Sequence, residues 1–102
     1  MSDQIQHPPW CDTSRCDVST DHVTGTHCSR VVVLGPYRPG PVVAEVSLAQ
    51  GLPIPGYRWS GRPFVALSLA TVDEEPFVTP LVVELASGLG RVLLTFVREA
   101  RG

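Results

Sequence analysis

The sequence predicts a small α+β domain with an N-terminal Cys/His knuckle, a three-stranded, mostly antiparallel sheet and one C-terminal amphipathic helix. Three observations support this fold class. All three cysteines and all three histidines lie within residues 1–30. Residues 31–102 are rich in Val, Leu and Ala, with Pro and Gly at positions typical of turns between strands. Residues 81–100 repeat apolar positions every three or four residues, as an amphipathic helix does.

The chain has 102 residues, which corresponds to one domain of ordinary size. We divide it into a knuckle at 1–30 and a sheet-plus-helix part at 31–102, which we expect to form one compact unit. The formal net charge is −2, with eight Arg and no Lys. This balance disfavours nonspecific binding to phosphate backbones, which requires clustered positive charge.

Three segments have the composition of strands: residues 30–37, 42–50 and 64–72. The first is β-branched and ends at Gly35-Pro36, and the second alternates apolar and polar positions as a half-buried antiparallel strand does. The expected core-facing positions are Val42, Ala44, Val46 and Leu48 in the second strand, and Val65, Leu67 and Leu69 in the third.

The C-terminal helix has a predicted start and a predicted buried face. Thr79 is a suitable N-cap, and Pro80 fits the first helical position because its missing N–H has no partner there. Gly88 and Gly90 cost the helix about 1 kcal/mol each, so we expect them to allow close packing against the sheet. The apolar stripe comprises Val82, Leu85, Leu89, Val92 and Phe96.

The Cys and His residues are candidate metal ligands. Zinc takes four sulfur or nitrogen ligands in a tetrahedron. The spacings His7-x3-Cys11 and Cys11-x4-Cys16 allow one short loop to present neighbouring ligands, and Trp10 would shield the thiolates from water. The spacing matches no standard zinc finger. We predict a structural zinc ion, with candidate ligands His7, Cys11, Cys16, His22, His27 and Cys28.

Other interpretations of this segment remain open. The thiols could be unliganded, or Cys11 and Cys16 could form a disulfide, although an odd number of cysteines in a reducing cytosol favours metal binding. A catalytic zinc keeps an open position and needs a nearby base, whereas aspartates beside such a loop more often cap turns. The chain has no His-Glu-x-x-His motif. We therefore expect no enzymatic activity.

"HPPWCDTSRC" (7–16), "GTHCSR" (25–30) and "FVTPLVVELASGL" (77–89) carry a family resemblance. They resemble small actinobacterial proteins of unknown function that open with a Cys- or His-Pro-x-Trp-Cys motif. The resemblance implies that His7, Cys11, Cys16 and His27 are the metal ligands. The chain departs from this pattern at Cys28, where the family usually has Arg, so Cys28 or His22 could substitute as a ligand.

A long loop at residues 51–63 carries a candidate partner-binding set, Tyr57, Arg58, Trp59 and Arg62. Aromatic residues and Arg are enriched at binding hot spots. The more conservative interpretation is that Trp59 covers the small core and the arginines are solvated.

The sequence favours a non-enzymatic, zinc-stabilised module that binds a protein, with self-association through a sheet edge or the helix as a variant. One alternative is a nucleic-acid-binding zinc module, which requires several arginines on one face: Arg15, Arg30, Arg38, Arg58 and Arg62. A second alternative is a metal- or thiol-dependent enzyme with a reactive Cys28. Residues 1–10 lack a signal-peptide pattern, and no apolar stretch is long enough to span a membrane, so we expect a cytoplasmic protein.

Overall fold

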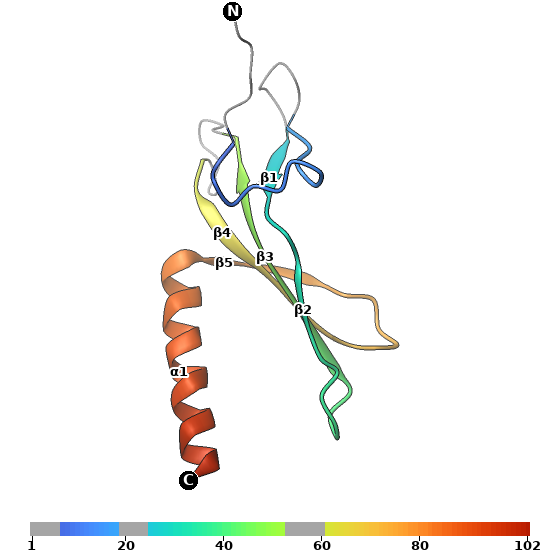
Figure 1. The fold of residues 1–102 in the computed structure, drawn as a ribbon, viewed down its shortest axis with the longest axis vertical. Coiled ribbons are helices and arrows are strands. Elements are labelled where there is room, and N and C mark those ends of the chain that lie inside the picture. The colour runs from blue at the N-terminus through green and yellow to red at the C-terminus, as the bar shows by residue number, and fades with distance from the viewer. Residues whose placement is uncertain (1–6, 19–24, 53–60) are drawn as a thin grey trace, which may run out of the picture.

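The computed structural model describes residues 7–18, 25–52 and 61–102. It has an α+β fold, in which an antiparallel sheet is followed by one C-terminal helix (Figure 1). The sheet has five strands, so the prediction of three is wrong. The elements are β1 (Thr26–Cys28), β2 (Val32–Leu34), β3 (Val42–Gly51), β4 (Pro63–Thr71), β5 (Val78–Val82) and α1 (Val83–Arg101).

Strand β3 organises the sheet. One edge of β3 pairs with β1 at residues 49–51 and with β2 at residues 44–46, while its other edge pairs with β4 along nine residues. β5 pairs with β4 on the outside of the sheet. The predicted strands at 42–50 and 64–72 correspond to β3 and β4, and the strand predicted at 30–37 is reduced to β2.

The two strands that the sequence did not reveal have weak signals for physical reasons. β1 has only three residues and no apolar alternation. β5 contains Pro80, which normally argues against a strand because it cannot donate to the ladder. Pro80 is tolerated because β5 lies at the edge of the sheet, where proline residues are accepted.

The predicted apolar faces of β3 and β4 do lie on the same side of the sheet. Val46 is opposite Leu67 and Leu48 is opposite Val65, and cross-strand partners share a face. This side is only partly covered, however, since Leu69 is 61% exposed. Among the described residues, Ala49 on the other face is the one buried hydrophobic side chain.

Helix α1 begins later than predicted. Thr79 and Pro80 belong to β5, where Thr79 pairs with Leu67, so the predicted N-cap at Thr79 and first helical residue at Pro80 are wrong. The observed N-cap is Val82, which makes no side-chain capping hydrogen bond. Pairing with β4 gives these residues a strand conformation, and this outweighs the local cap signal.

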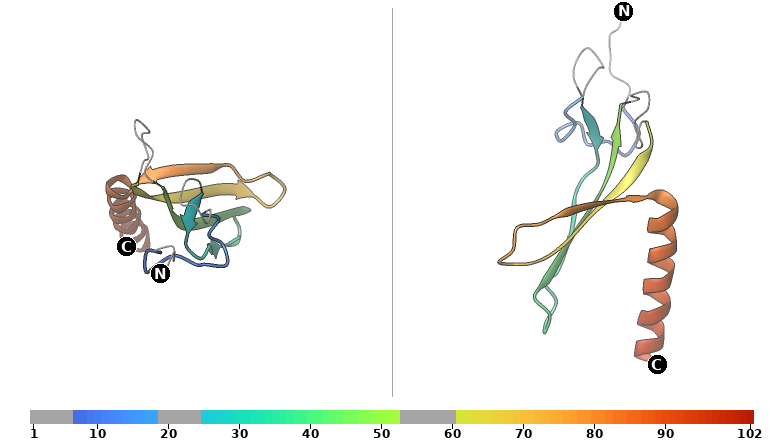
Figure 2. Two further views of the ribbon diagram at one scale, coloured as in Figure 1. Left: turned by 90° about the horizontal axis from the view of Figure 1, so that it is seen from above. Right: turned by 180° about the vertical axis from the view of Figure 1, so that it is seen from behind.

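Helix α1 contacts β4 and β5 and then extends away from the sheet (Figure 2). The predicted close packing at Gly88 and Gly90 is wrong, because a Cβ added at either position would meet nothing within 4 Å. Within the described part of the chain, no helix has the length and apolar character needed to cross a membrane.

A serine joins β1 to β2 along the edge of β3. The Ser29 N–H donates to the carbonyl of Leu48 (2.9 Å), and the Leu48 N–H donates to the Ser29 hydroxyl oxygen (2.8 Å). The side chain of Ser29 thus takes the place of a backbone acceptor between the two short strands. Ser29 is buried, so its hydroxyl satisfies a backbone group in a position that is shielded from water.

We expect Ser29→Ala to destabilise the protein by about 1–3 kcal/mol, because it leaves the Leu48 N–H without its acceptor. Urea denaturation of the full chain measures this change. The control is Ser87→Ala, which removes a hydroxyl from an exposed position on α1 and should change stability by less than about 0.5 kcal/mol. Equal effects of the two substitutions would contradict the bridging role of Ser29.

We expect Gly88→Ala to stabilise the protein by up to about 1 kcal/mol, since alanine favours the helix and its Cβ enters open space. Gly35→Ala is the contrasting variant. Gly35 has a φ of +91°, and an added Cβ would lie 2.8 Å from the Val42 carbonyl oxygen, so this change should destabilise. Thermal denaturation distinguishes the two. A loss of stability in Gly88→Ala would show that the helix is closely packed at this point.

Candidate metal centre

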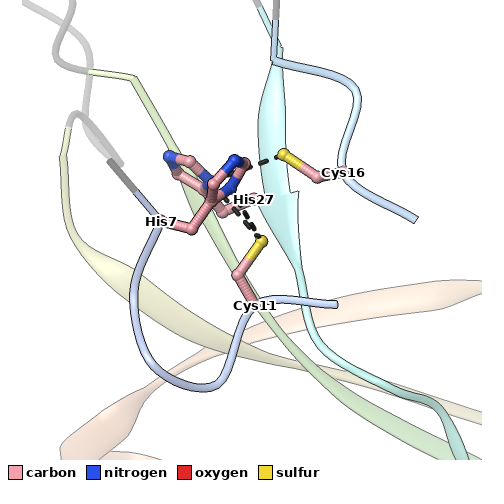
Figure 3. Close-up of side chains that lie close together, drawn as sticks. All are labelled: His7, Cys11, Cys16 and His27. Atoms are coloured by element: carbon pink, nitrogen blue, oxygen red, sulfur yellow. Dashed lines mark hydrogen bonds between the residues drawn. The ribbon is translucent and has the colours of Figure 1, made fainter. Parts of the chain in front are cut away.

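Four side chains from two separate segments meet near the N-terminal end of the described chain. His7, Cys11 and Cys16 come from the loop at residues 7–18, and His27 comes from β1 (Figure 3). One nitrogen or sulfur atom from each lies within 4.8 Å of those of the others. These are the four residues that the family resemblance implied as metal ligands.

A proline turn brings His7 and Cys11 together. The Cys11 N–H donates to the carbonyl of Pro8 (2.9 Å), which closes a four-residue turn. Pro9 occupies the second position of this turn, where the fixed φ of proline is favoured. As a result, Cys11 Sγ lies 3.4 Å from His7 Nδ1.

A second turn directs Cys16 back to the cluster. The carbonyl of Asp12 accepts the N–H groups of Arg15 (2.9 Å) and Cys16 (3.1 Å). The Asp12 carboxylate accepts the N–H and the hydroxyl of Ser14, at 3.0 and 2.7 Å, and these hydrogen bonds lower the pKa of Asp12. Asp12 therefore caps this turn, as expected of an aspartate in such a loop.

Backbone hydrogen bonds hold the loop against β1 on both sides of His27. The Asp12 N–H donates to the carbonyl of Cys28 (2.8 Å). At the other side, the Thr26 N–H donates to Asp17 Oδ1 (2.6 Å), and the Asp17 N–H donates to the Thr26 carbonyl (3.3 Å). Gly25 has a φ of +114° and an added Cβ there would collide with the backbone of residues 17 and 18, so glycine permits the close approach.

Three distances between the clustered atoms match the sulfur–nitrogen distance around a tetrahedral zinc ion. His27 Nδ1 lies 3.6 Å from Cys11 Sγ and 3.5 Å from Cys16 Sγ. With Zn–S near 2.3 Å and Zn–N near 2.0–2.1 Å, a tetrahedron places sulfur and nitrogen about 3.6 Å apart. The cluster thus has the donor types of a four-ligand zinc site, and three of its sulfur–nitrogen distances fit such a site.

The electrostatic environment favours the neutral forms of the Cys11 thiol and the His27 imidazole. Burial raises the pKa of the Cys11 thiol, and the neighbouring Cys16 raises it further. Burial also lowers the pKa of His27, with a smaller contribution from the nearby His7, whose ring centroid is 5.1 Å from that of His27. Neutral imidazole is the form that binds a metal, whereas a thiol must release its proton to do so.

The structure separates His27 from Cys28. Successive side chains of a strand point to opposite faces, so Cys28 lies away from the cluster and its thiol donates to the Thr26 carbonyl at 3.8 Å. All three cysteines are free. The substitute ligand His22 lies outside the described residues. β1 has only three residues and gives no strand signal in the sequence, although the alternation along this strand is what distinguishes His27 from Cys28.

Trp10 and the predicted partner-binding residues lie outside this cluster. Half-buried Trp10 lines a cavity of about 190 Å³ with residues of β2, β3 and β4, among them Val32, Leu48 and Val65. Tyr57, Arg58 and Trp59 fall outside the described residues. Arg62 is exposed directly before β4.

We compared the chain with protein-family models, curated proteins and solved structures, and none of the three comparisons gives a match. The resemblance to small actinobacterial proteins therefore stays a prediction from the sequence.

Proposed function

We propose that this protein is a non-enzymatic, cytoplasmic interaction module whose N-terminal loop is held in place by a structural zinc ion and whose partner is a protein. The observation that carries the metal part is the set of three sulfur–nitrogen distances of 3.4, 3.5 and 3.6 Å among His7, Cys11, Cys16 and His27. Two thiolates and two imidazoles in a tetrahedron suit zinc better than magnesium or calcium, which prefer oxygen ligands.

The number of ligands supports a structural role for the metal. Catalytic zinc sites usually have three protein ligands and keep the fourth position for water or substrate. Here four side chains converge, so a bound zinc ion would have a complete coordination shell from the protein. The free energy of zinc binding would then stabilise the loop at residues 7–18 on β1.

The positions of Arg38 and Arg62 favour a protein over a nucleic acid as partner. Arg38 lies in the turn between β2 and β3, next to the end of the sheet where Val42 pairs with Thr71. Arg62 precedes β4 at the opposite end, where Gln50 pairs with Pro63. Charges placed at opposite ends of a sheet do not form the concentrated positive patch that binds phosphates.

Native mass spectrometry of protein purified without added metal should show one zinc ion per chain, lost on denaturation. Cys16→Ser should lose the metal, because it removes one of four ligands. The matched control is Cys28→Ser, which removes a thiol outside the cluster and should keep full zinc content. Wild-type protein without zinc, or equal zinc loss in both variants, would contradict the proposed site.

We expect Asp12→Ala to weaken zinc binding by roughly fivefold, because the loss of about 1 kcal/mol of hydrogen bonding loosens the turn that positions Cys16. Competition with a chromophoric chelator measures the affinity. Asp73→Ala, which removes an exposed carboxylate from the turn after β4, is the control and should leave the affinity unchanged. An unchanged affinity in Asp12→Ala would show that this turn does not position the ligands.

A further inference from the structure

The sheet face that holds Ala49 also carries a glutamate next to a serine. Glu45 in β3 is opposite Ser68 in β4, and cross-strand partners share a face. Glu45 is half-buried, and Ser68 is only 4% exposed. Neither side chain makes a hydrogen bond or an ion pair with any residue that the structure describes. Buried polar groups are normally paired, so the carboxylate and the hydroxyl are both available to a ligand.

Two cavities share these side chains. One has a volume of about 280 Å³ and the other of about 180 Å³, and Glu45 and Ser68 line both. The Ser68 hydroxyl is not enclosed by protein atoms, so it faces this shared space. The neighbouring positions on the same face of β4 are Ala66 and Ala70, which also line the cavities. Because these side chains are small, a group from outside can approach the carboxylate closely.

The larger cavity has acidic and apolar walls. Glu45 and Glu74 both line it, and the described residues around it include no Arg, Lys or His. The Thr71 N–H donates to Glu74 Oε1 (2.9 Å), which lowers the pKa of Glu74 and favours its ionised form. Val72 and Pro76 supply apolar surface. A complementary ligand therefore has a cationic head and an apolar stem.

Arg15 leaves the charge of Glu45 unpaired. It lines the smaller cavity, but its guanidinium donates to the Ser29 carbonyl. Within the described part of the chain it forms no ion pair with Glu45. The Glu45 carboxylate can therefore accept a cation that another molecule supplies.

We propose that Glu45, Ser68 and Glu74, which we call the Glu45 site, bind the guanidinium group of an arginine side chain on a partner protein. Arginine combines an apolar stem with a planar head that has several N–H donors, which suits a carboxylate beside a hydroxyl. The guanidinium is also more weakly hydrated than the ammonium of lysine, so partial burial costs it less. This inference rests on the proposed function, because it names the chemistry of the protein partner.

Titration of the isotope-labelled full chain with N-acetyl-arginine amide, followed by two-dimensional NMR, tests the proposal. We expect the amides of residues 43–47 and 66–70 to shift, with a dissociation constant on the order of millimolar, as for a single side chain. N-acetyl-citrulline amide has nearly the same shape without the charge, so it should bind at least about tenfold more weakly. N-acetyl-lysine amide, which carries the charge on a compact ammonium, should also bind more weakly.

Two variants test the role of the carboxylate. Glu45→Gln should weaken arginine binding about tenfold, because it removes the charge and keeps the shape. The matched control is Glu84→Gln, which makes the same change at an exposed position on α1 and should leave the affinity unchanged. The NMR spectrum of each variant shows directly whether it is folded.

Several outcomes would overturn the proposal. They are an absence of shifts at these amides, equal binding of arginine and citrulline, tighter binding of lysine, and equal effects of the two variants. Shifts of the same amides on dilution of the wild-type protein alone would show that a second copy supplies the arginine, which would contradict a separate partner. Zinc content is measured on the same samples, so a chain that holds zinc and binds no arginine contradicts the Glu45 site and leaves the metal site standing.

Discussion

The hydrogen bonds that hold residues 12–17 against β1 determine where the candidate ligands lie. Asp12 binds the Cys28 carbonyl on one side of His27, and Asp17 binds both polar backbone groups of Thr26 on the other. Because most of these contacts involve the backbone, the position of the thiols follows from the course of the chain and not from long, flexible side chains. These backbone contacts therefore fix where the four candidate ligands converge.

The same arrangement links the cluster to the sheet. β1 has three residues and is a strand only because β3 extends far enough to pair with it. Ser29 then connects β1 to β2 along that edge, and the guanidinium of Arg15 donates to the Ser29 carbonyl. The loop and the strand edge thus support each other, so a change at Ser29 affects both the sheet and the site.

Local spacing was sufficient to predict part of the site, and longer-range contacts explain the rest. His7, Cys11 and Cys16 lie within ten residues, and short turns rich in Pro, Asp and Ser bring them together. The choice between His27 and Cys28 depends on strand alternation, and β1 has too few residues to be recognised without its pairing to β3. The Thr79-Pro80 pair has the local signal of a helix start, but pairing with β4 makes it part of β5. The exposure of Gly88 likewise depends on where the helix lies, which its own sequence does not contain.

The His/Cys cluster and helix α1 both lie where the chain buries little apolar surface. A chain of this size buries little apolar surface on its own, and small domains gain stability from metals or from oligomerisation. The loop at residues 7–18 has Val18 as its one branched aliphatic residue, so a metal ion would be the stabilising element that its side chains can support. Around α1 the aliphatic side chains are present but uncovered, so the missing element there is a surface. In our proposal a zinc ion stabilises the end that carries the His/Cys cluster.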